Sequence, residues 1–261
     1  MSVEARVLAL SLTPVKGLRI VNVDQIALEA GGVRGDRRFY LVEERGRLVN
    51  GKHAGALNEV VAEIEDGGAA EILSMRFPDG SSVSAPVELG EQLDTDFYRR
   101  TRPAQVVDGP FAQALSRHVG ERLRLVRAID GDSAIDRGGK GGVSLISSAS
   151  LGALARVADR PSVDGRRFRM TIELDGVEPF AEDSWLGRTV EIGDGSVLVH
   201  GHVGRCIVTT KHPDSGVADL PTLDLLRAFR ANTDTTEPLP FGVYGEVTRP
   251  GVVRVGDRVE V

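Results

Sequence analysis

The chain has 261 residues, 41% of them hydrophobic and 27% charged, which is typical of a globular protein with a sizeable buried core. Its net charge is −6 and only 5% of its residues are aromatic, which argues against a nucleic-acid-binding surface, because such surfaces need positive charge and stacking rings. A single cysteine, Cys206, excludes an internal disulfide, a multi-thiolate zinc site and an iron–sulfur cluster held by this chain alone.

The distribution of apolar residues argues against a membrane protein. No apolar run approaches the roughly 20 residues that a membrane-spanning helix needs. The first residues, MSVEARVLALSL, lack the basic start and apolar core of a signal peptide. We therefore expect a cytoplasmic protein with no membrane and no nucleic-acid partner.

The first part of the chain has the pattern of short β-strands. Strand-like runs alternate with Gly, Asp, Asn and Pro, and Asp79-Gly80 forms the tip of a predicted turn at residues 78–84. The predicted strands cover residues 3–12, 22–30, 37–44, 59–65 and 70–77. This pattern favours a barrel or a sandwich.

After residue 101 the pattern becomes mixed. Helices are predicted at 111–120, with Gly120 as the stop, at 147–161, with Ser147 or Ser148 as the cap, and at 221–230. Residues 129–142 form a polar, glycine-rich loop. Further strands are predicted at 121–128, 167–174, 188–193, 196–203, 206–210 and in the closing segment 241–261.

These elements together predict a mainly β protein of the α+β class in two parts. We expect an N-terminal, β-barrel-like domain at residues 1–105 and a second domain at 106–261 that is a β-barrel with a few short helices. The segment at residues 102–110 has the composition of a linker.

Basic residues cluster at turns and strand starts despite the acidic total. Lys16, Arg37, Lys140, Arg169 and Arg205 lie in or beside glycine turns or at the starts of predicted strands. Side chains and backbone N–H groups can converge on an anion at such positions. A solvated surface would explain each cluster alone, whereas all of them near one thiol indicate a site for a phosphate-bearing ligand.

Cys206 allows a structural and a chemical interpretation. Free cysteine is among the most buried residue types, but the neighbouring Arg205 favours the thiolate, which binds soft metals. His200 and His202 lie on one face of a predicted strand and would allow a zinc site with Cys206. Histidines on an exposed strand face are the more common arrangement, and no nucleotide-binding or nucleophile-elbow motif is present.

Two segments of the sequence resemble a known family. RCIVTTKHPDSGVADLPTLDLLRAFR, followed by FGVYGEVTRPGVVRVGDRVEV, closely resembles the MOSC domain, the C-terminal domain of molybdenum cofactor sulfurases. LSLTPVKGLRI and GGVRGDRRFYLVEERGRLV resemble the N-terminal β-barrel that accompanies this domain. The segment RFRMTIELDGVEPFAEDSWLGRTVEIG is similar to the family's middle part, so the resemblance covers most of the chain.

The resemblance implies a molybdenum cofactor, or molybdopterin, and an oxidoreductase similar to the amidoxime-reducing members of the family. It implies that Cys206 is the metal ligand and catalytic residue, and that small N-hydroxylated or N-oxygenated molecules are reduced without pyridoxal phosphate. The implied cofactor-binding residues are Lys16, Arg37, Lys140, Arg169, Arg205 and Thr171. A separate electron donor, a reductase or a ferredoxin-like protein, is expected because the chain has no second redox motif.

The sequence departs from the family pattern at four positions. Gly17 replaces a frequent serine, Thr171 replaces an asparagine, Gly204 replaces a serine, and the loop around Lys140 lacks hydroxyl side chains. Two alternatives therefore stay open. The chain could carry the cofactor, or sulfur on Cys206, for delivery to other enzymes, or it could be a metal-free MOSC-fold enzyme of a specialised biosynthetic pathway.

Overall fold

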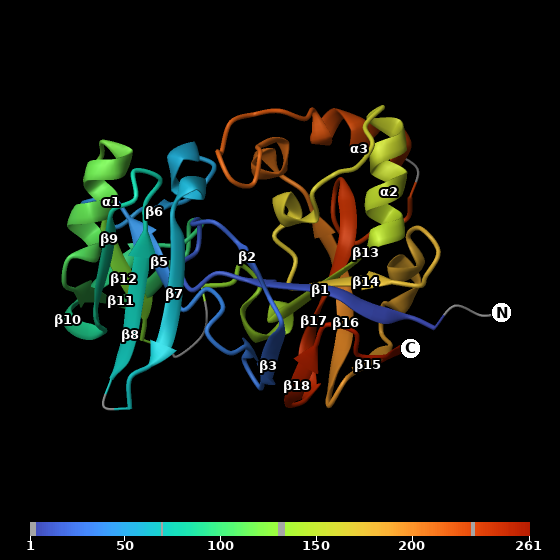
Figure 1. Ribbon diagram of the computed structural model, residues 1–261, viewed down its shortest axis with the longest axis horizontal. Helices are drawn as coiled ribbons and strands as arrows, with labels where there is room; N and C mark the ends of the chain where they lie inside the picture. The colour runs from blue at the N-terminus through green and yellow to red at the C-terminus, as the bar shows by residue number, and fades with distance from the viewer. Residues whose placement is uncertain (1–3, 69, 130–133, 231–232) are drawn as a thin grey trace.

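A computed structural model describes residues 4–68, 70–129, 134–230 and 233–261. It shows two lobes side by side (Figure 1), each built on β-sheets with short helices at the periphery. The expected mainly β, α+β fold is confirmed, and the described residues contain three α-helices: α1 (Phe111–Val119), α2 (Ser148–Val157) and α3 (Thr222–Arg230). None of these helices is long and apolar enough to cross a membrane.

The lobe on the right of Figure 1 contains an eight-stranded sheet in the order β19-β15-β16-β17-β13-β14-β1-β2. Its strands are β1 (Arg6–Leu12), β2 (Val21–Val23), β13 (Val143–Ser147), β14 (Ile172–Asp175), β15 (Thr189–Ile192), β16 (Gly195–Gly204), β17 (Pro240–Arg249) and β19 (Val259–Glu260). A three-stranded sheet, β18-β3-β4, packs against the same core through Ile26, Leu28 and Val253. Its strands are β3 (Gln25–Glu29), β4 (Gly32–Val33) and β18 (Gly251–Arg254).

The lobe on the left contains a five-stranded sheet, β10-β11-β12-β5-β6, and a three-stranded sheet, β7-β8-β9. Apolar residues of both sheets and of α1 form one core, with Phe39, Leu73 and Phe111 fully buried. The strands are β5 (Phe39–Val42), β6 (Leu48–Val49), β7 (Val61–Asp66), β8 (Glu71–Arg76), β9 (Ser82–Pro86), β10 (Glu88–Asp96), β11 (Thr101–Asp108) and β12 (Arg124–Ala128).

The two lobes are interwoven at the N-terminus. β1 pairs with β14 in antiparallel fashion, so the first strand of the chain belongs to the sheet of the second lobe. The expected boundary between residues 105 and 106 falls inside β11, whose neighbours β10 and β12 lie in the same sheet. The division into domains 1–105 and 106–261 stays a prediction.

The helix ends follow the sequence signals. Gly120, with φ 81°, ends α1 in the left-handed conformation that glycine adopts without strain, and its N–H donates to the Ser116 carbonyl. The Ser147 hydroxyl accepts a hydrogen bond from the Ser150 N–H and so caps α2. The three predicted helices are therefore confirmed, with α2 ending at Val157, four residues before Pro161.

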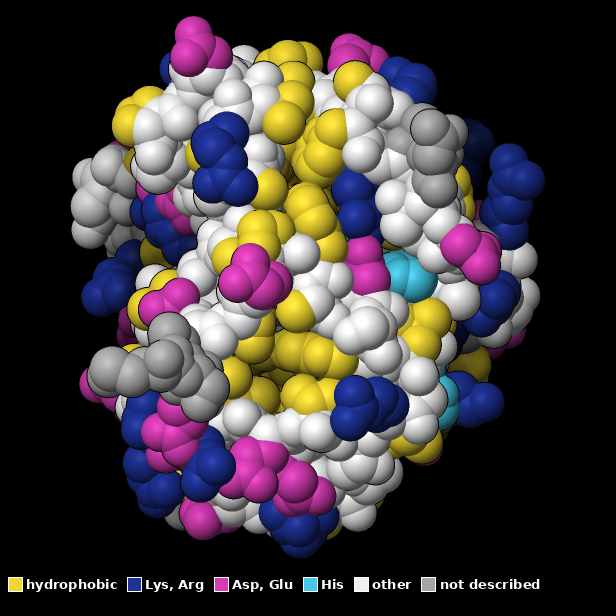
Figure 2. All heavy atoms as spheres, turned by 90° about the vertical axis from the view of Figure 1, so that its right-hand side faces the viewer, with side chains coloured by type: hydrophobic (Ala, Val, Ile, Leu, Met, Phe, Trp, Pro, Cys, Tyr) yellow, Lys and Arg dark blue, Asp and Glu magenta, His cyan; other side chains and the backbone are white. Residues whose placement is uncertain are grey.

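The outer face of the right-hand lobe carries mixed charge. Figure 2 shows apolar side chains in a band down the middle of this face, with acidic and basic side chains interspersed around it. Charges of both signs at a surface largely screen one another, so this face offers no strong field to a charged ligand.

Candidate functional site

A pocket of about 200 Å³ lies where the two lobes meet. The chain reaches it at several points that are distant in sequence: the turn after β1, the segment after β6, the hairpin between β10 and β11, and the loops before β13 and after β16. Among the described residues, its charged lining consists of seven cations and one acid: Lys16, Arg37, Lys52, Arg137, Arg167, Arg169 and Arg205, with Asp136.

Five of the residues expected to form a site line this pocket together: Lys16, Arg37, Arg169, Arg205 and Cys206. The structure does not bring the other two into it. Lys140 is exposed at the end of a 3-10 turn, Gly138–Gly141. Thr171 is buried, and its hydroxyl is used by Ser144, donating to the carbonyl at 2.8 Å and accepting from the N–H at 2.7 Å.

Lys16 and Asp136 form the ion pair of the pocket. The Lys16 ammonium lies 2.5 Å from the Asp136 carboxylate, and the lysine side chain is only 12% exposed. Burial lowers the pKa of Lys16, Asp136 raises it, and the nearby charges of Arg37 and Arg169 lower it further. A carboxylate of the chain therefore sits where several cations converge.

The side chains of Arg37 and Arg169 each donate a hydrogen bond to a backbone carbonyl of a distant segment. The Arg37 guanidinium donates to the Arg169 carbonyl at 2.7 Å and pairs with the buried Asp36. The Arg169 guanidinium donates to the Leu18 carbonyl at 2.8 Å. Burial, and then the charge of Arg37, lower the pKa of Arg169 to about 10. Arg169 lacks a carboxylate partner among the described side chains and is therefore suited to an incoming anion.

Arg169 does not lie in the strand that the sequence predicts at residues 167–174. Gly165–Phe168 form a 3-10 turn (η3), Arg169 follows in the left-handed conformation at φ 57°, and β14 begins only at Ile172. The Asp164 carboxylate caps η3 by accepting from the Arg166 N–H. The Asp-Gly start is a turn signal that the β-like composition of the following residues masked.

Arg205 is oriented by carbonyl groups rather than by an acid. Its guanidinium donates to the Phe168 and Phe241 carbonyls, each at 2.8 Å, and stacks 5.1 Å from the Phe168 ring. Burial lowers the pKa of Arg205 to about 9; the charge of Cys206 opposes this effect and that of Arg137 adds to it. A buried cation with neutral partners leaves a positive field beside the thiol.

Cys206 is free and half-buried at the start of a 3-10 turn (η5, Ile207–Thr210). The strand predicted for residues 206–210 is therefore wrong. The Thr209 N–H and hydroxyl both donate to the Cys206 carbonyl at 3.0 Å, and the Thr210 hydroxyl donates to the Ile207 carbonyl. These local hydrogen bonds of threonine compete with extended structure and explain the error.

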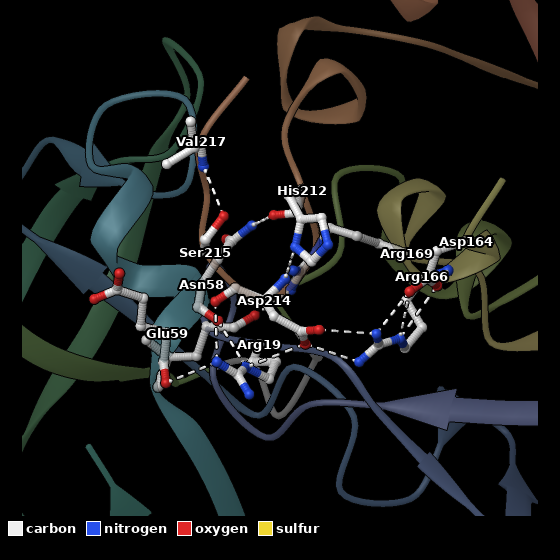
Figure 3. A network of polar contacts seen from close by, with 11 residues as sticks. Arg19, Asn58, Glu59, Asp164, Arg166, Arg169, His212, Asp214, Ser215 and Val217 are labelled. Carbon is white, nitrogen blue, oxygen red and sulfur yellow. Dashed lines mark hydrogen bonds and ion pairs between the residues drawn. The ribbon is translucent and has the colours of Figure 1, made fainter. Parts of the chain in front are cut away.

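The loop that follows η5 is fastened to the first lobe by the network in Figure 3. Arg166 grips the Asp214 carboxylate with two hydrogen bonds of 2.8 and 3.0 Å. Arg19, from the turn after β1, donates to the Asp214 carbonyl at 2.9 Å and to the Asn58 carbonyl at 2.9 Å. Since Cys206 lies in the same segment, this network fixes the thiol relative to both lobes.

Comparison with known proteins places this arrangement in a family. The family model for the MOSC domain matches residues 132–260, and the model for the MOSC N-terminal beta barrel domain matches residues 4–120. The chain belongs to the MOSC family. The pocket therefore lies where the two matched segments meet, with Lys16 and Arg37 in the first and Cys206 in the second.

Several named proteins are similar to this MOSC chain. Mitochondrial amidoxime-reducing component 1 of Xenopus laevis is 27% identical over 96% of the chain and 80% of that protein. The mouse protein of the same name is 35% identical over 44% of the chain and 35% of its own length. Molybdenum cofactor sulfurase of Oryza sativa subsp. japonica is 24% identical over 78% of the chain and 28% of that protein. Among solved structures, the YUAD protein of Bacillus subtilis matches at 11% identity with a TM-score of 0.44, covering 98% and 93% of the two chains.

The histidines of the MOSC domain do not form a zinc site with Cys206. His200 lies 3.3 Å from Glu246, whereas the buried His202 lies 3.6 Å from Asp183. Within the described ranges, no group of three or more His, Cys, Asp or Glu side chains could hold a metal ion. Burial lowers the pKa of His202, with Asp183 opposing the shift.

Two unpartnered atoms of the MOSC pocket favour a polar ligand. The Asn58 side-chain oxygen and the Arg167 Nε are buried without a hydrogen-bond partner, and both residues line the pocket. Buried polar atoms without partners are costly, so a ligand that supplies both a donor and an anionic acceptor suits this cavity. Gly17 lets two backbone segments approach closely at the pocket, since at its φ of 99° an added Cβ would lie only 3.0 Å from the Asn50 Cα.

Some lining residues had no signal in the sequence. Asn50, Asn58, Tyr98 and Asp136 belong to loops and turns without a motif, and only the fold brings them to the pocket. Arg167 lies two residues before Arg169 in the sequence, but its ion pair with Asp219, at 3.1 Å, is evident only in the structure.

Proposed function

We propose that this MOSC protein binds a molybdenum cofactor and reduces N-hydroxylated or N-oxygenated small molecules. The observation that carries the proposal is the charge of the pocket: among the described residues, seven cations, one acid and a free thiol line it, and Arg169 and Arg205 bond to carbonyl groups instead of carboxylates. A pterin-based molybdenum cofactor combines an anionic phosphate with a metal that accepts a soft thiolate. The similarity to amidoxime-reducing components and to a molybdenum cofactor sulfurase supports the same ligand.

The chain's own residues divide the binding between two ends. Lys16, Arg37 and Arg169 form the anion end, and the fork of each arginine matches phosphate oxygens bidentately. Cys206 forms the metal end, next to Arg205, and its sulfur is the soft ligand that the chain offers. The orphaned Asn58 oxygen and Arg167 Nε would bind the pterin's polar edge. When bound, the cofactor supplies the two-electron redox chemistry that no side chain of this protein has.

The reaction needs electrons from outside the chain. We expect a separate donor protein of the reductase or ferredoxin-like class. A cytoplasmic location stays a prediction, since the amidoxime-reducing relatives are named as mitochondrial. The four departures from the family pattern do not remove the cation set, because Lys16, Arg37 and Arg169 all reach the pocket. The missing serine and asparagine therefore change the shape of the cavity more than its charge.

Turnover separates a reductase from a carrier. Protein purified from a host that makes molybdopterin is mixed without oxygen with a chemically reduced viologen dye and an N-hydroxylated compound. A reductase oxidises two molecules of the one-electron dye for each molecule of deoxygenated product, and two protons are taken up as the oxygen leaves as water. Protein that holds the cofactor but leaves dye and compound unchanged would contradict the proposal and favour the carrier role, for which the similarity to the sulfurase is the supporting observation.

A further inference from the structure

The hairpin between β10 and β11 has an unusual turn. Phe97 and Arg100 exchange two backbone hydrogen bonds of 2.9 and 3.3 Å, which leaves Tyr98 and Arg99 as a two-residue loop. Both loop residues have positive φ, 56° and 64°. Such turns favour Asn-Gly, because a Cβ is strained in this conformation. Here two bulky residues occupy both positions, and backbone strain of this kind clusters at functional sites.

The two strained residues have different surroundings. Arg99 is exposed and does not belong to the pocket lining, whereas Tyr98 lines the pocket together with Cys206. The Tyr98 ring lies 5.6 Å from the Lys16 ammonium and 5.2 Å from the Lys52 ammonium, and it meets the Phe97 ring edge-on at 5.2 Å. The left-handed turn therefore delivers a phenol into the cationic pocket from the first lobe.

The Tyr98 hydroxyl can donate a hydrogen bond to a ligand. The Asn50 side-chain amide donates to it at 3.0 Å, which uses the oxygen as an acceptor. No acceptor for the hydroxyl proton lies within hydrogen-bond distance in the part of the chain that the structure describes. Burial, Asp136 and Cys206 raise the pKa of Tyr98, and the Asn50 bond and Arg169 oppose the rise. The phenol thus remains a neutral donor across the physiological pH range.

Exposure decides which ligand this donor meets. Tyr98 is 38% exposed as a residue, whereas the side chain of the neighbouring Lys16 is 12% exposed. A resident cofactor would contact the less exposed cations, and a diffusing substrate would reach the more exposed phenol. We propose that the Tyr98 hydroxyl binds the substrate, donating a hydrogen bond to the oxygen of its N–O group. This inference rests on the proposed function.

The assignment predicts how the pocket discriminates. A site built to hydrogen-bond one substrate oxygen rejects the analogue that lacks it, because the bound analogue covers the donor and leaves it unpaired. Compounds with an N–O oxygen are therefore preferred over the same compounds without it. The cations of the pocket can also donate to the extra oxygen, so the loss of the preference in Tyr98→Phe, and not the preference alone, reports on Tyr98.

Equilibrium binding tests the assignment without turnover. N-hydroxy-N′-phenylurea and phenylurea are both uncharged at pH 7 and differ by one oxygen, and titration calorimetry with the purified cofactor-loaded protein compares them. Wild type binds the hydroxyurea about tenfold more tightly, as one hydrogen bond allows. Tyr98→Phe keeps the ring and its contacts, and it binds the two compounds equally.

Arg99→Asn is the matched control in the same turn. Asparagine tolerates positive φ, so this variant melts about 2–4 °C higher than wild type and keeps the tenfold preference. The kcat/KM of Tyr98→Phe for the hydroxylated compound falls about tenfold, and its pH profile keeps the wild-type shape between pH 6 and 9.

Two results would overturn the assignment: no preference in wild type, or an undiminished preference in Tyr98→Phe of unchanged melting temperature. Failure of the proposed function looks different. Wild type would then prefer the hydroxyurea and lose this preference on Tyr98→Phe, yet produce no phenylurea when supplied with the reduced dye.

Discussion

Two clefts of the molecule differ in size and in charge balance. The larger has a volume of about 1050 Å³ and is lined by five basic and five acidic side chains, whereas the Cys206 pocket, of about 200 Å³, has seven basic and one acidic. In the larger cleft the charges pair with one another, as in Arg34–Glu29 at 2.5 Å and Arg38–Glu71 at 2.7 Å. In the smaller, Arg169 and Arg205 bond only to carbonyl groups and a thioether sulfur. The charge balance of the lining, more than the volume of the cleft, therefore distinguishes an anion site from a solvated groove.

Replacing the soft ligand has the largest expected effect. Cys206→Ser changes the side-chain size little but exchanges a thiolate for a harder oxygen. We expect reductase activity to vanish while the melting temperature stays within about 2 °C of wild type, measured by dye oxidation and thermal unfolding. Retention of full activity in the serine variant would show that the thiol is a packed side chain.

The next effect comes from the unpaired cations. A hydrogen bond to a charged group contributes about 1.5–3 kcal/mol, so Arg169→Ala weakens cofactor retention about tenfold or more. The pterin and molybdenum content after gel filtration measures the change. The exposed Arg45, in the turn between β5 and β6, provides the control, since Arg45→Ala leaves the content unchanged. Equal content in both variants would mean that the cluster is a solvated face.

Removing Asp136, the one acidic side chain among the described lining residues, should strengthen anion binding. Asp136 pairs with Lys16 and competes with any incoming anion. In cofactor-free protein, Asp136→Asn therefore binds inorganic pyrophosphate about threefold to tenfold more tightly by calorimetry, a gain of about 1 kcal/mol. Unchanged or weaker affinity would show that Asp136 does not occupy the anion position.

A small third cavity, of about 60 Å³, is lined by two acidic side chains, Glu173 and Asp164. Burial, and then Asp164 and Asp175, raise the pKa of Glu173 there to about 7. The folded state holds this proton more tightly than the unfolded chain, so stability falls as the pH rises from about 4.5 to 7. Glu173→Gln stabilises the protein at pH 8 by about 1 kcal/mol and has no effect at pH 4, as thermal unfolding at both pH values would show. Equal stability of the two proteins at pH 8 would refute the shift.

The sequence anticipates elements whose signals are local. Gly120 and Ser147 mark helix ends through their own backbone chemistry, and these helices are confirmed. The errors at residues 167–171 and 206–210 arise where β-forming residues fold into 3-10 turns, held by the Asp164 cap and by threonine hydroxyls. Composition alone does not reveal these competing hydrogen bonds.

The residues of the candidate site likewise fall into those with a local sequence signal and those that only the tertiary structure reveals. Lys16, Arg37, Arg169, Arg205 and Cys206 stand in recognisable motifs, and the fold brings them together. Lys140 and Thr171 stand in matching segments too, but one faces solvent and the other is engaged with Ser144. Tyr98, Asn58 and Asp136 reach the pocket through tertiary contacts between lobes, which a single sequence does not encode in any short motif.

Two neighbouring residues test whether the Cys206 pocket binds the cofactor, because Arg37 lines this pocket and Arg38 lines the larger cleft. Wild type, Arg37→Gln and Arg38→Gln are purified from a host that makes molybdopterin, and their molybdenum and pterin contents are measured. We expect about one equivalent of each in wild type and in Arg38→Gln, and a loss of about tenfold or more in Arg37→Gln. Equal contents in the two variants, or wild-type protein without molybdenum and pterin, would contradict it.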